Sequence, residues 1–261
     1  MSGHDARSGE LSTRRIMGDL AIALVFFTRL PLPHFDLPGK TLGGALWAAP
    51  LVGVAVAIAG GAAYTLSHAI GINEGVAAAI ALAITMLFTG CLHEDGLADT
   101  ADAFGGGRTI ARKLEIMRDS RIGTYGASAL AMSVLLRWTS LASLPGGASA
   151  VCALIAAHTA SRGALALFVQ RTPYARADGL AASVGSVSNT VLLASLCLGA
   201  LPLLLLGIGP AIILALIIGA TFLCLRSLFI RQIGGITGDT LGAAQQAIEI
   251  CMLIAAAAIL G

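Results

Sequence analysis

Charged residues are scarce in this chain of 261 residues. They make up 11% of it, whereas an ordinary soluble domain carries about 25%. Aromatic residues are also few, and the formal net charge is only +2 with no basic run between aromatics, so no nucleic-acid partner is expected. The five cysteines lie far apart and form no CxxC pair, so we interpret them as small buried apolar residues.

Hydrophobic residues, in contrast, make up 57% of the chain. This predicts an all-α fold, a polytopic membrane helix bundle that forms one domain over residues 1–261. A span needs about 20 mostly apolar residues, and Gly and Ala in these runs predict close helix packing. We expect about seven spans, at residues 42–66, 75–92, 125–144, 149–169, 189–207, 209–225 and 243–260.

The N-terminal region differs from the spans. Residues 1–19 are polar and are expected to form a tail rather than a cleavable signal. The apolar run at residues 20–30 is too short to cross a bilayer, so we predict an interfacial or re-entrant helix there.

The basic residues alternate with the predicted spans. Fourteen of the 16 Lys and Arg residues fall in segments that share one side of the membrane. By the positive-inside rule, that side, with the N-terminus and the three long loops, is cytoplasmic. With seven spans, the C-terminus lies outside.

The most informative segment follows the second predicted span. Glu94, Asp95, Asp99 and Asp102 place four of the 14 acidic residues within nine positions, directly after His93. Three of these carboxylates have the i, i+4, i+7 spacing of one helix face, where a divalent cation would offset their repulsion. Mg²⁺ prefers carboxylate oxygens and keeps positions open for phosphate, so we predict a metal site for a phosphorylated substrate. Gly96 is expected to let a ligand approach the backbone.

A segment between the second and third predicted spans suits phosphate binding. Arg118, Ser120 and Arg121 lie in a stretch of arginines, hydroxyls and glycines, and arginines bind phosphate in a bidentate manner. A weaker signal, at residues 171–180, suggests a wall of the substrate site.

The last loop surrounds one aspartate with glycines and threonines. Gly234, Gly235 and Thr237 could form a turn whose backbone N–H groups hold a phosphate, and Asp239 could complete a metal site or hold a hydroxyl. A plain turn between two helices is the alternative.

A few ionisable residues fall inside predicted spans. His158 and Arg162 are four residues apart and can share a helix face, and Arg137 lies in mid-span. We interpret them as buried partners for a carboxylate. Glu249, also within a span, is a functional candidate because such residues are costly in lipid.

Taken together, the motifs resemble those of the cobalamin 5′-phosphate synthase family, also called adenosylcobinamide-GDP ribazoletransferase. The resemblance runs in order along nearly the whole chain. It rests on the segments 26–33, 93–102, 115–126 and 234–243.

The resemblance implies an integral inner-membrane, Mg²⁺-dependent enzyme of late cobalamin biosynthesis in bacteria. Such an enzyme transfers the adenosylcobinamide-phosphate group of adenosylcobinamide-GDP to α-ribazole or its 5′-phosphate and releases GMP. Its partners are these substrates and the lipid bilayer, and a homo-oligomer is compatible with the sequence.

On this hypothesis the acidic cluster holds one or two Mg²⁺ ions on the pyrophosphate. Its ligands are Asp95, Asp99 and Asp102, with Glu94 as a further candidate. His93 or a carboxylate accepts the proton of the ribazole hydroxyl, and Asp239 binds ribose or guanine. Arg118 and Arg121 clamp the phosphates.

Two other classes of protein share some of these features. A CDP-alcohol phosphotransferase also places aspartates at the end of a membrane helix, but here Asp99 stands where that family has arginine, and its later pair of aspartates is absent. A cation transporter would place its acidic residues within spans, and only Glu249 fits that pattern.

Overall fold

The computed structural model describes residues 3–31, 41–176 and 184–261. All the elements named within them are helices, as the composition predicts. They are α1 (Gly3–Phe27), α2 (Leu42–Ala45), η1 (Leu46–Ala48), α3 (Ala49–Ala69), α4 (Glu74–Thr89), α5 (Leu92–Gly106), α6 (Ile110–Ile116), α7 (Thr124–Ala142), α8 (Gly147–Gly163), α9 (Leu165–Arg171), α11 (Asn189–Ala200), η2 (Leu201–Leu206), α12 (Ile208–Ile233) and α13 (Gly238–Leu260).

Five helical segments in the described part of the chain are long and apolar enough to cross a membrane. They are Leu42–Ala69, Gly147–Arg171, Asn189–Leu206, Ile208–Ile233 and Gly238–Leu260. The bent pair α4 and α5 makes a sixth if it counts as one span. These segments agree in position with six of the predicted spans.

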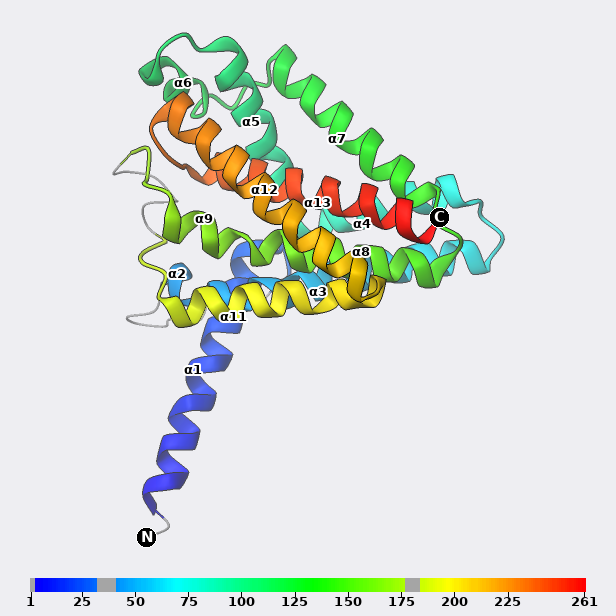
Figure 1. Ribbon diagram of the computed structural model, residues 1–261, viewed down its shortest axis with the longest axis horizontal. Helices are drawn as coiled ribbons and strands as arrows, with labels where there is room; N and C mark the ends of the chain where they lie inside the picture. Colours follow the sequence, from blue (N-terminus) through cyan, green and yellow to red (C-terminus); the bar gives the residue numbers. More distant parts are fainter. Residues whose placement is uncertain (1–2, 32–40, 177–183) are drawn as a thin grey trace.

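The remaining predicted span, at residues 125–144, corresponds to α7. This helix is not apolar enough to qualify as a membrane span. Arg137 and several hydroxyl residues lower its hydropathy. The structure therefore supports five or six spans, and the count of seven stays a prediction. The C-terminus lies at the end of the bundle away from α6 (Figure 1).

The N-terminal helix is longer than expected. One helix, α1, includes most of the predicted polar tail and ends at Phe27. It runs across the direction of the long bundle helices and projects from the body (Figure 1). Asp19 anchors it, because its Oδ2 accepts a hydrogen bond from Trp47 Nε1 at 3.1 Å. α1 is not among the described segments that are long and apolar enough to cross a membrane, and its placement at the interface stays a prediction.

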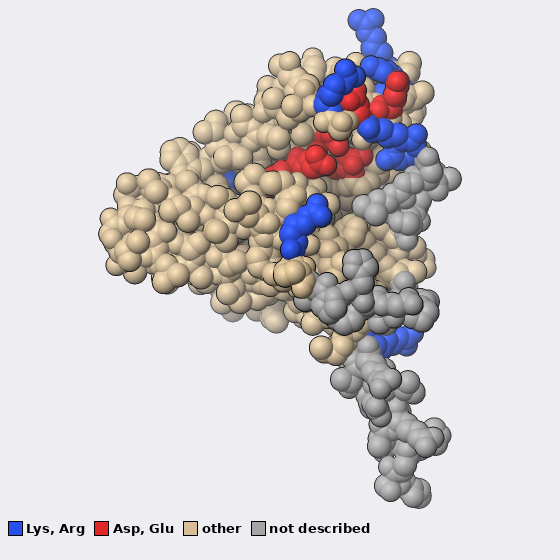
Figure 2. Space-filling model, turned by 180° about the vertical axis from the view of Figure 1, so that it is seen from behind, with Lys and Arg blue, Asp and Glu red and all other residues tan. Residues whose placement is uncertain are grey.

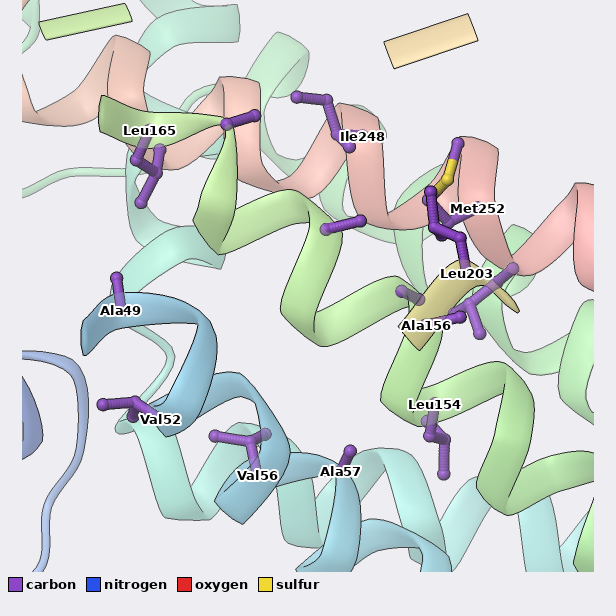
Figure 3. Close-up of a cluster of buried hydrophobic side chains, with 14 of the residues drawn as sticks. Ala49, Val52, Val56, Ala57, Leu154, Ala156, Leu165, Leu203, Ile248 and Met252 are labelled. Atoms are coloured by element: carbon purple, nitrogen blue, oxygen red, sulfur yellow. The ribbon is translucent and has the colours of Figure 1, made fainter. Parts of the chain in front are cut away.

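The core is built on close helix packing. α8 lies between α3 and α13 and contacts both (Figure 3). Small residues set the spacing of α8 from its neighbours. A Cβ added at Gly53 on α3 would clash with the backbone of His158 on α8, and one added at Gly163 on α8 would lie 2.9 Å from the Cα of Gly199 on α11. In lipid, where exclusion from water does not drive helices together, such close contact is a main source of helix association.

The chain bends sharply between α4 and α5, by 89°. Gly90 ends α4 in the left-handed conformation, and Cys91 follows with a φ of 56°. Left-handed residues commonly end helices because they let the last carbonyls be satisfied, and here the N–H of Cys91 donates to Met86 O at 2.9 Å. The bend turns the acidic helix α5 away from the line of α4.

α5 crosses α13 in direct backbone contact. A Cβ added at Gly96 would lie 2.7 Å from the carbonyl oxygen of Asp239 and 3.2 Å from the Cα of Gly242. The lack of a side chain at Gly96 thus lets α13 approach, and Gly96 also lines the cavity described below. The contact brings the acidic face of α5 beside the first turn of α13.

A buried network of charges ties the same helices together. Arg137 on α7 lies 2.9 Å from Glu94 on α5 and 3.2 Å from Glu249 on α13. On α8, His158 Nδ1 lies 2.9 Å from Glu249 Oε2, and Arg162 lies 3.8 Å from the same oxygen. Arg137 and Arg162 are thus buried partners of carboxylates, as interpreted from the sequence.

Amide and hydroxyl groups complete this network. Gln245 donates to Glu249 at 2.6 Å and to Ser161 at 3.0 Å, and Gln246 donates to Glu94 at 3.4 Å. Ser133 donates to Gln246 at 3.0 Å. Two carboxylates and two guanidinium groups balance in charge, which lowers the cost of burying them in a bundle surrounded by lipid.

The contact between α5 and α13 predicts that Gly96→Ala lowers the stability of the protein. Overpacking a core contact costs about 1–3 kcal/mol, while Ala gains about 1 kcal/mol over Gly within a helix. Gly219→Ala on α12 is the control, because nothing lies within 4 Å of a Cβ at that position. The measurement is thermal unfolding in detergent; equal midpoints for the two variants would contradict the contact.

The charge network predicts a larger effect for Arg137→Gln. Removing one partner leaves buried carboxylates without compensation, at a cost of about 3–5 kcal/mol. Arg112→Gln, which breaks the exposed 2.7 Å pair with Glu115, should cost less than about 1 kcal/mol. Chemical unfolding of both variants in mixed micelles compares them, and a small effect at both positions would disprove the role of the network.

Candidate functional site

Carboxylates from two helices meet at the crossing of α5 and α13. Asp95 is exposed, while Asp99 and Asp239 are partly buried. Burial, together with the neighbouring charges of Asp95, Asp239 and Asp102, raises the pKa of Asp99 to about 7. Figure 2 shows the acidic side chains gathered in one patch with basic side chains on either side. Their mutual repulsion favours a bound cation.

The patch borders a cavity of about 210 Å³. One part of its lining is apolar and comes from the end of α1, from α2 and η1, and from α9. The other part, which holds the polar residues, comes from α5, α13 and the loop that follows α9. The lining includes Phe26, Phe27, Leu46, Leu165, Val169, His93, Asp95, Arg176 and Asp239.

His93 is one of the residues that line this cavity. It is 3% exposed, and its ring stacks on Phe27 with ring centroids 5.8 Å apart. Its Nε2 atom is buried and has no hydrogen-bond partner within the described structure. Such an atom is costly to bury unpaired.

Arg176 is a site residue that the sequence analysis did not single out. Its Nη2 lies 4.0 Å from Asp239 Oδ2, and its Nη1 is buried without a partner in the described structure. The loop that carries Arg176 follows α9 and pairs with the segment before α13. Ile236 N donates to Pro173 O, and Ala175 N donates to Ile236 O. Its only sequence signal is its place in the loop predicted as a wall, of which residues 177–180 lie outside the described residues.

Asp102 has a different place from Asp95 and Asp99. Its carboxylate accepts hydrogen bonds from Gly123 N at 2.7 Å and from Gly126 N at 2.8 Å. It therefore satisfies free N–H groups at the start of α7. The predicted metal ligand holds the loop before α7 against the end of α5.

Glu94 points into the bundle rather than toward the cavity. It is 5% exposed and belongs to the charge network through Arg137. Successive residues on a helix point about 100° apart, so Glu94 and Asp95 serve different surroundings. The structure thus separates Glu94 from the cluster in which it was predicted.

Arg118, Ser120 and Arg121 lie on the exposed loop between α6 and α7. None of the three lines the cavity. Arg121 Nη2 lies 2.6 Å from Asp119, and this guanidinium group lowers the pKa of the Asp119 carboxyl to about 2. The loop stays beside α5 because Asp102 binds its end.

The glycines and threonine of the last loop hold the backbone in place. Gly234 ends α12 with a φ of 82°, which favours glycine. A Cβ at Gly235 would clash with the backbone of Pro173, and Thr237 caps α13 through the N–H of Thr240. These residues place Asp239, which alone of the four lines the cavity.

The donor atoms suit Mg²⁺ bound together with a phosphate. In the described part of the chain, no three His, Cys, Asp or Glu side chains already form a metal-ion site. Mg²⁺, however, is usually held by one or two carboxylates with substrate phosphates and waters. Asp95, Asp99 and Asp239 supply carboxylates at one surface, so these residues fit such an ion.

The arrangement brings together the groups that a phosphoryl transfer needs. Carboxylates can hold a metal on a pyrophosphate, a buried imidazole can take up a proton, and a guanidinium group can bind phosphate oxygens.

Comparison with known proteins agrees with this chemistry. The family model described as cobalamin-5-phosphate synthase matches residues 19–257. A protein of Mesorhizobium japonicum named adenosylcobinamide-GDP ribazoletransferase is 52% identical over 94% of this chain and 95% of its own length. A protein of Bradyrhizobium diazoefficiens with the same name is 46% identical over 96% of this chain and 97% of its own length.

A third relative, from Ralstonia nicotianae, bears that name as well and is 43% identical over 92% of this chain and 95% of its own. No solved structure matches the chain. The family match covers α5, the loop between α6 and α7, and the start of α13. The chain therefore belongs to the cobalamin-5-phosphate synthase family.

Proposed function

We propose that this protein transfers the adenosylcobinamide-phosphate group of adenosylcobinamide-GDP to α-ribazole or its 5′-phosphate, and releases GMP. The relatives that support this proposal carry the name of that activity. The structural observation that carries it is the gathering of Asp95, Asp99 and Asp239 beside the cavity that contains His93.

The reaction exchanges a phosphoanhydride bond of the pyrophosphate for a phosphate ester bond to the acceptor. The ribazole hydroxyl oxygen attacks the phosphorus that bears cobinamide, and the bond to the GMP oxygen breaks with its electron pair going to GMP. The hydroxyl proton passes to His93 Nε2 or to the carboxylate of Asp95, which line the same cavity. Holding both substrates beside these groups supplies much of the rate enhancement.

Mg²⁺, when bound, neutralises negative charge on the pyrophosphate and on the leaving phosphate. Asp99, Asp95 and Asp239 would hold it. Arg176 is placed to bind a phosphate oxygen through its buried Nη1, which has no partner in the described residues. Arg118 and Arg121, on the loop beside α5, are proposed to bind the more distant phosphate of the GDP group.

The proposed location is the bacterial inner membrane, with the site on the cytoplasmic face. The acidic patch lies near the end of the molecule that carries most basic side chains, as Figure 2 shows. The positive-inside rule assigns such an end to the cytoplasm. Nucleotide substrates would reach the site from there.

The direct test is an assay of the purified protein in detergent or liposomes. Adenosylcobinamide-GDP and α-ribazole 5′-phosphate are supplied with and without Mg²⁺, and both products are separated by chromatography. We expect GMP and the cobamide phosphate in equal amounts, and only with the metal present. GMP release without a cobamide would indicate hydrolysis and would reject the proposal.

Asp99→Asn is expected to reduce turnover by about 100-fold or more. Even residues that only support metal ligands cost about 10- to 100-fold in metal affinity or activity when changed. Stability should not fall, because the substitution removes a like charge from a cluster of carboxylates.

Glu74→Gln is the matched control for this variant. Glu74 is exposed at the start of α4, away from the acidic patch, so activity should stay at the wild-type level. Full activity in Asp99→Asn would remove this residue from the metal site. The assay is initial-rate GMP release at saturating substrates, with thermal unfolding measured in parallel.

A further inference from the structure

The apolar part of the cavity has no role in the phosphate chemistry described above. Its walls are Phe26, Phe27, Leu46, Leu165 and Val169, from α1, η1 and α9. We propose that it binds the aromatic base of the acceptor nucleoside, an inference that rests on the proposed function. The adenosylcobinamide-GDP donor then lies outside it, over the acidic patch.

Size selects the acceptor over the donor. The cavity measures about 210 Å³, whereas pockets for drug-sized molecules measure about 300–1,000 Å³. A flat base of two fused rings is smaller than such a molecule and suits this space. A corrin macrocycle is larger than a drug-sized molecule and does not.

The shape of the lining also orients the acceptor. Apolar side chains and the rings of Phe26 and Phe27 suit the faces and methyl groups of dimethylbenzimidazole, the base of α-ribazole. The ribose attached to that base then points to the polar part, where Asp95 and Asp239 lie. This places the ribose hydroxyls next to the groups that hold the pyrophosphate.

His93 gives the second, independent sign of a ligand. Its side chain is more than nine-tenths buried, and its Nε2 has no partner among the described residues. His93 lines the cavity together with Phe27, on which its ring stacks, and with the neighbouring Asp95. A ribose hydroxyl at that atom would satisfy it, which an acyl chain in the same cavity would not do.

The test uses two identical substitutions on one helix. Leu165 lines the cavity, while Leu167, also on α9, packs against the core outside it. Leu165→Phe should raise the KM for α-ribazole 5′-phosphate by about 10-fold or more, the scale on which a small change of volume acts in an apolar pocket. Leu167→Phe should leave it unchanged. The KM for adenosylcobinamide-GDP should be the same in both variants and in the wild type.

Leu165→Ala tests the same point in the opposite direction. It enlarges the cavity, so the ratio of kcat/KM for a nucleoside with a three-ring base to that for α-ribazole should rise by about 10-fold. An unchanged ratio, together with an unchanged acceptor KM in Leu165→Phe, overturns the proposal. A rise in the donor KM instead would assign the cavity to the donor and also overturn it.

A binding measurement separates this proposal from the proposed function. Free dimethylbenzimidazole is equilibrated by dialysis with each purified variant in detergent, with no second substrate. We expect binding to the wild type and to Leu167→Phe, and binding about 10-fold weaker to Leu165→Phe. This pattern in a protein without transferase activity supports the cavity as a site for the base while rejecting the reaction.

The opposite combination is equally informative. Normal turnover without any difference in base binding between the two leucine variants supports the reaction and overturns the subsite. A tightly held lipid in the purified protein, with no binding of the base in any variant, assigns the cavity to an acyl chain and also overturns it.

Discussion

The backbones of α5 and α13 touch where Gly96 meets Gly242, and the acidic patch depends on that contact. Carboxylates brought so close repel one another, so the aspartates of the patch do not stabilise the helix crossing. Its stability comes from the contact itself and from the buried charges that the same two helices direct into the bundle. There, Glu94 of α5 and Glu249 of α13 both bind Arg137, which fastens the two helices to α7.

The two groups of charges therefore have opposite roles. The inner group pairs its carboxylates with arginines inside the bundle and supports the fold. The outer group has excess negative charge, although Arg176 lies 4.0 Å from Asp239. A protein surrounded by lipid keeps such an imbalance where a ligand compensates it. The candidate site differs from the structural network because its carboxylates are not fully paired with arginines. The number of acidic residues matters less.

Much of the architecture could be predicted from the sequence, because the bilayer requires long apolar helices whose ends are visible as polar segments. The helix spacing of Asp95 and Asp99 also predicted their shared surface correctly. The same spacing could not show that Asp102 caps α7, because that depends on where a later helix begins. Nor could it reveal the cavity, whose walls at Phe27 and Leu165 are far apart along the chain. Such contacts arise from packing, which no local pattern encodes.

The most direct test of this account is metal binding at the crossing of α5 and α13. Mn²⁺ in place of Mg²⁺ is followed by electron paramagnetic resonance on purified protein, with and without GDP. The account predicts binding that tightens with GDP and weakens by about 10-fold or more in Asp239→Asn, since a ligand is lost. It predicts no change in Glu74→Gln, whose carboxylate is exposed at the start of α4. Equal Mn²⁺ affinity in both variants and the wild type would contradict a metal site built from α5 and α13.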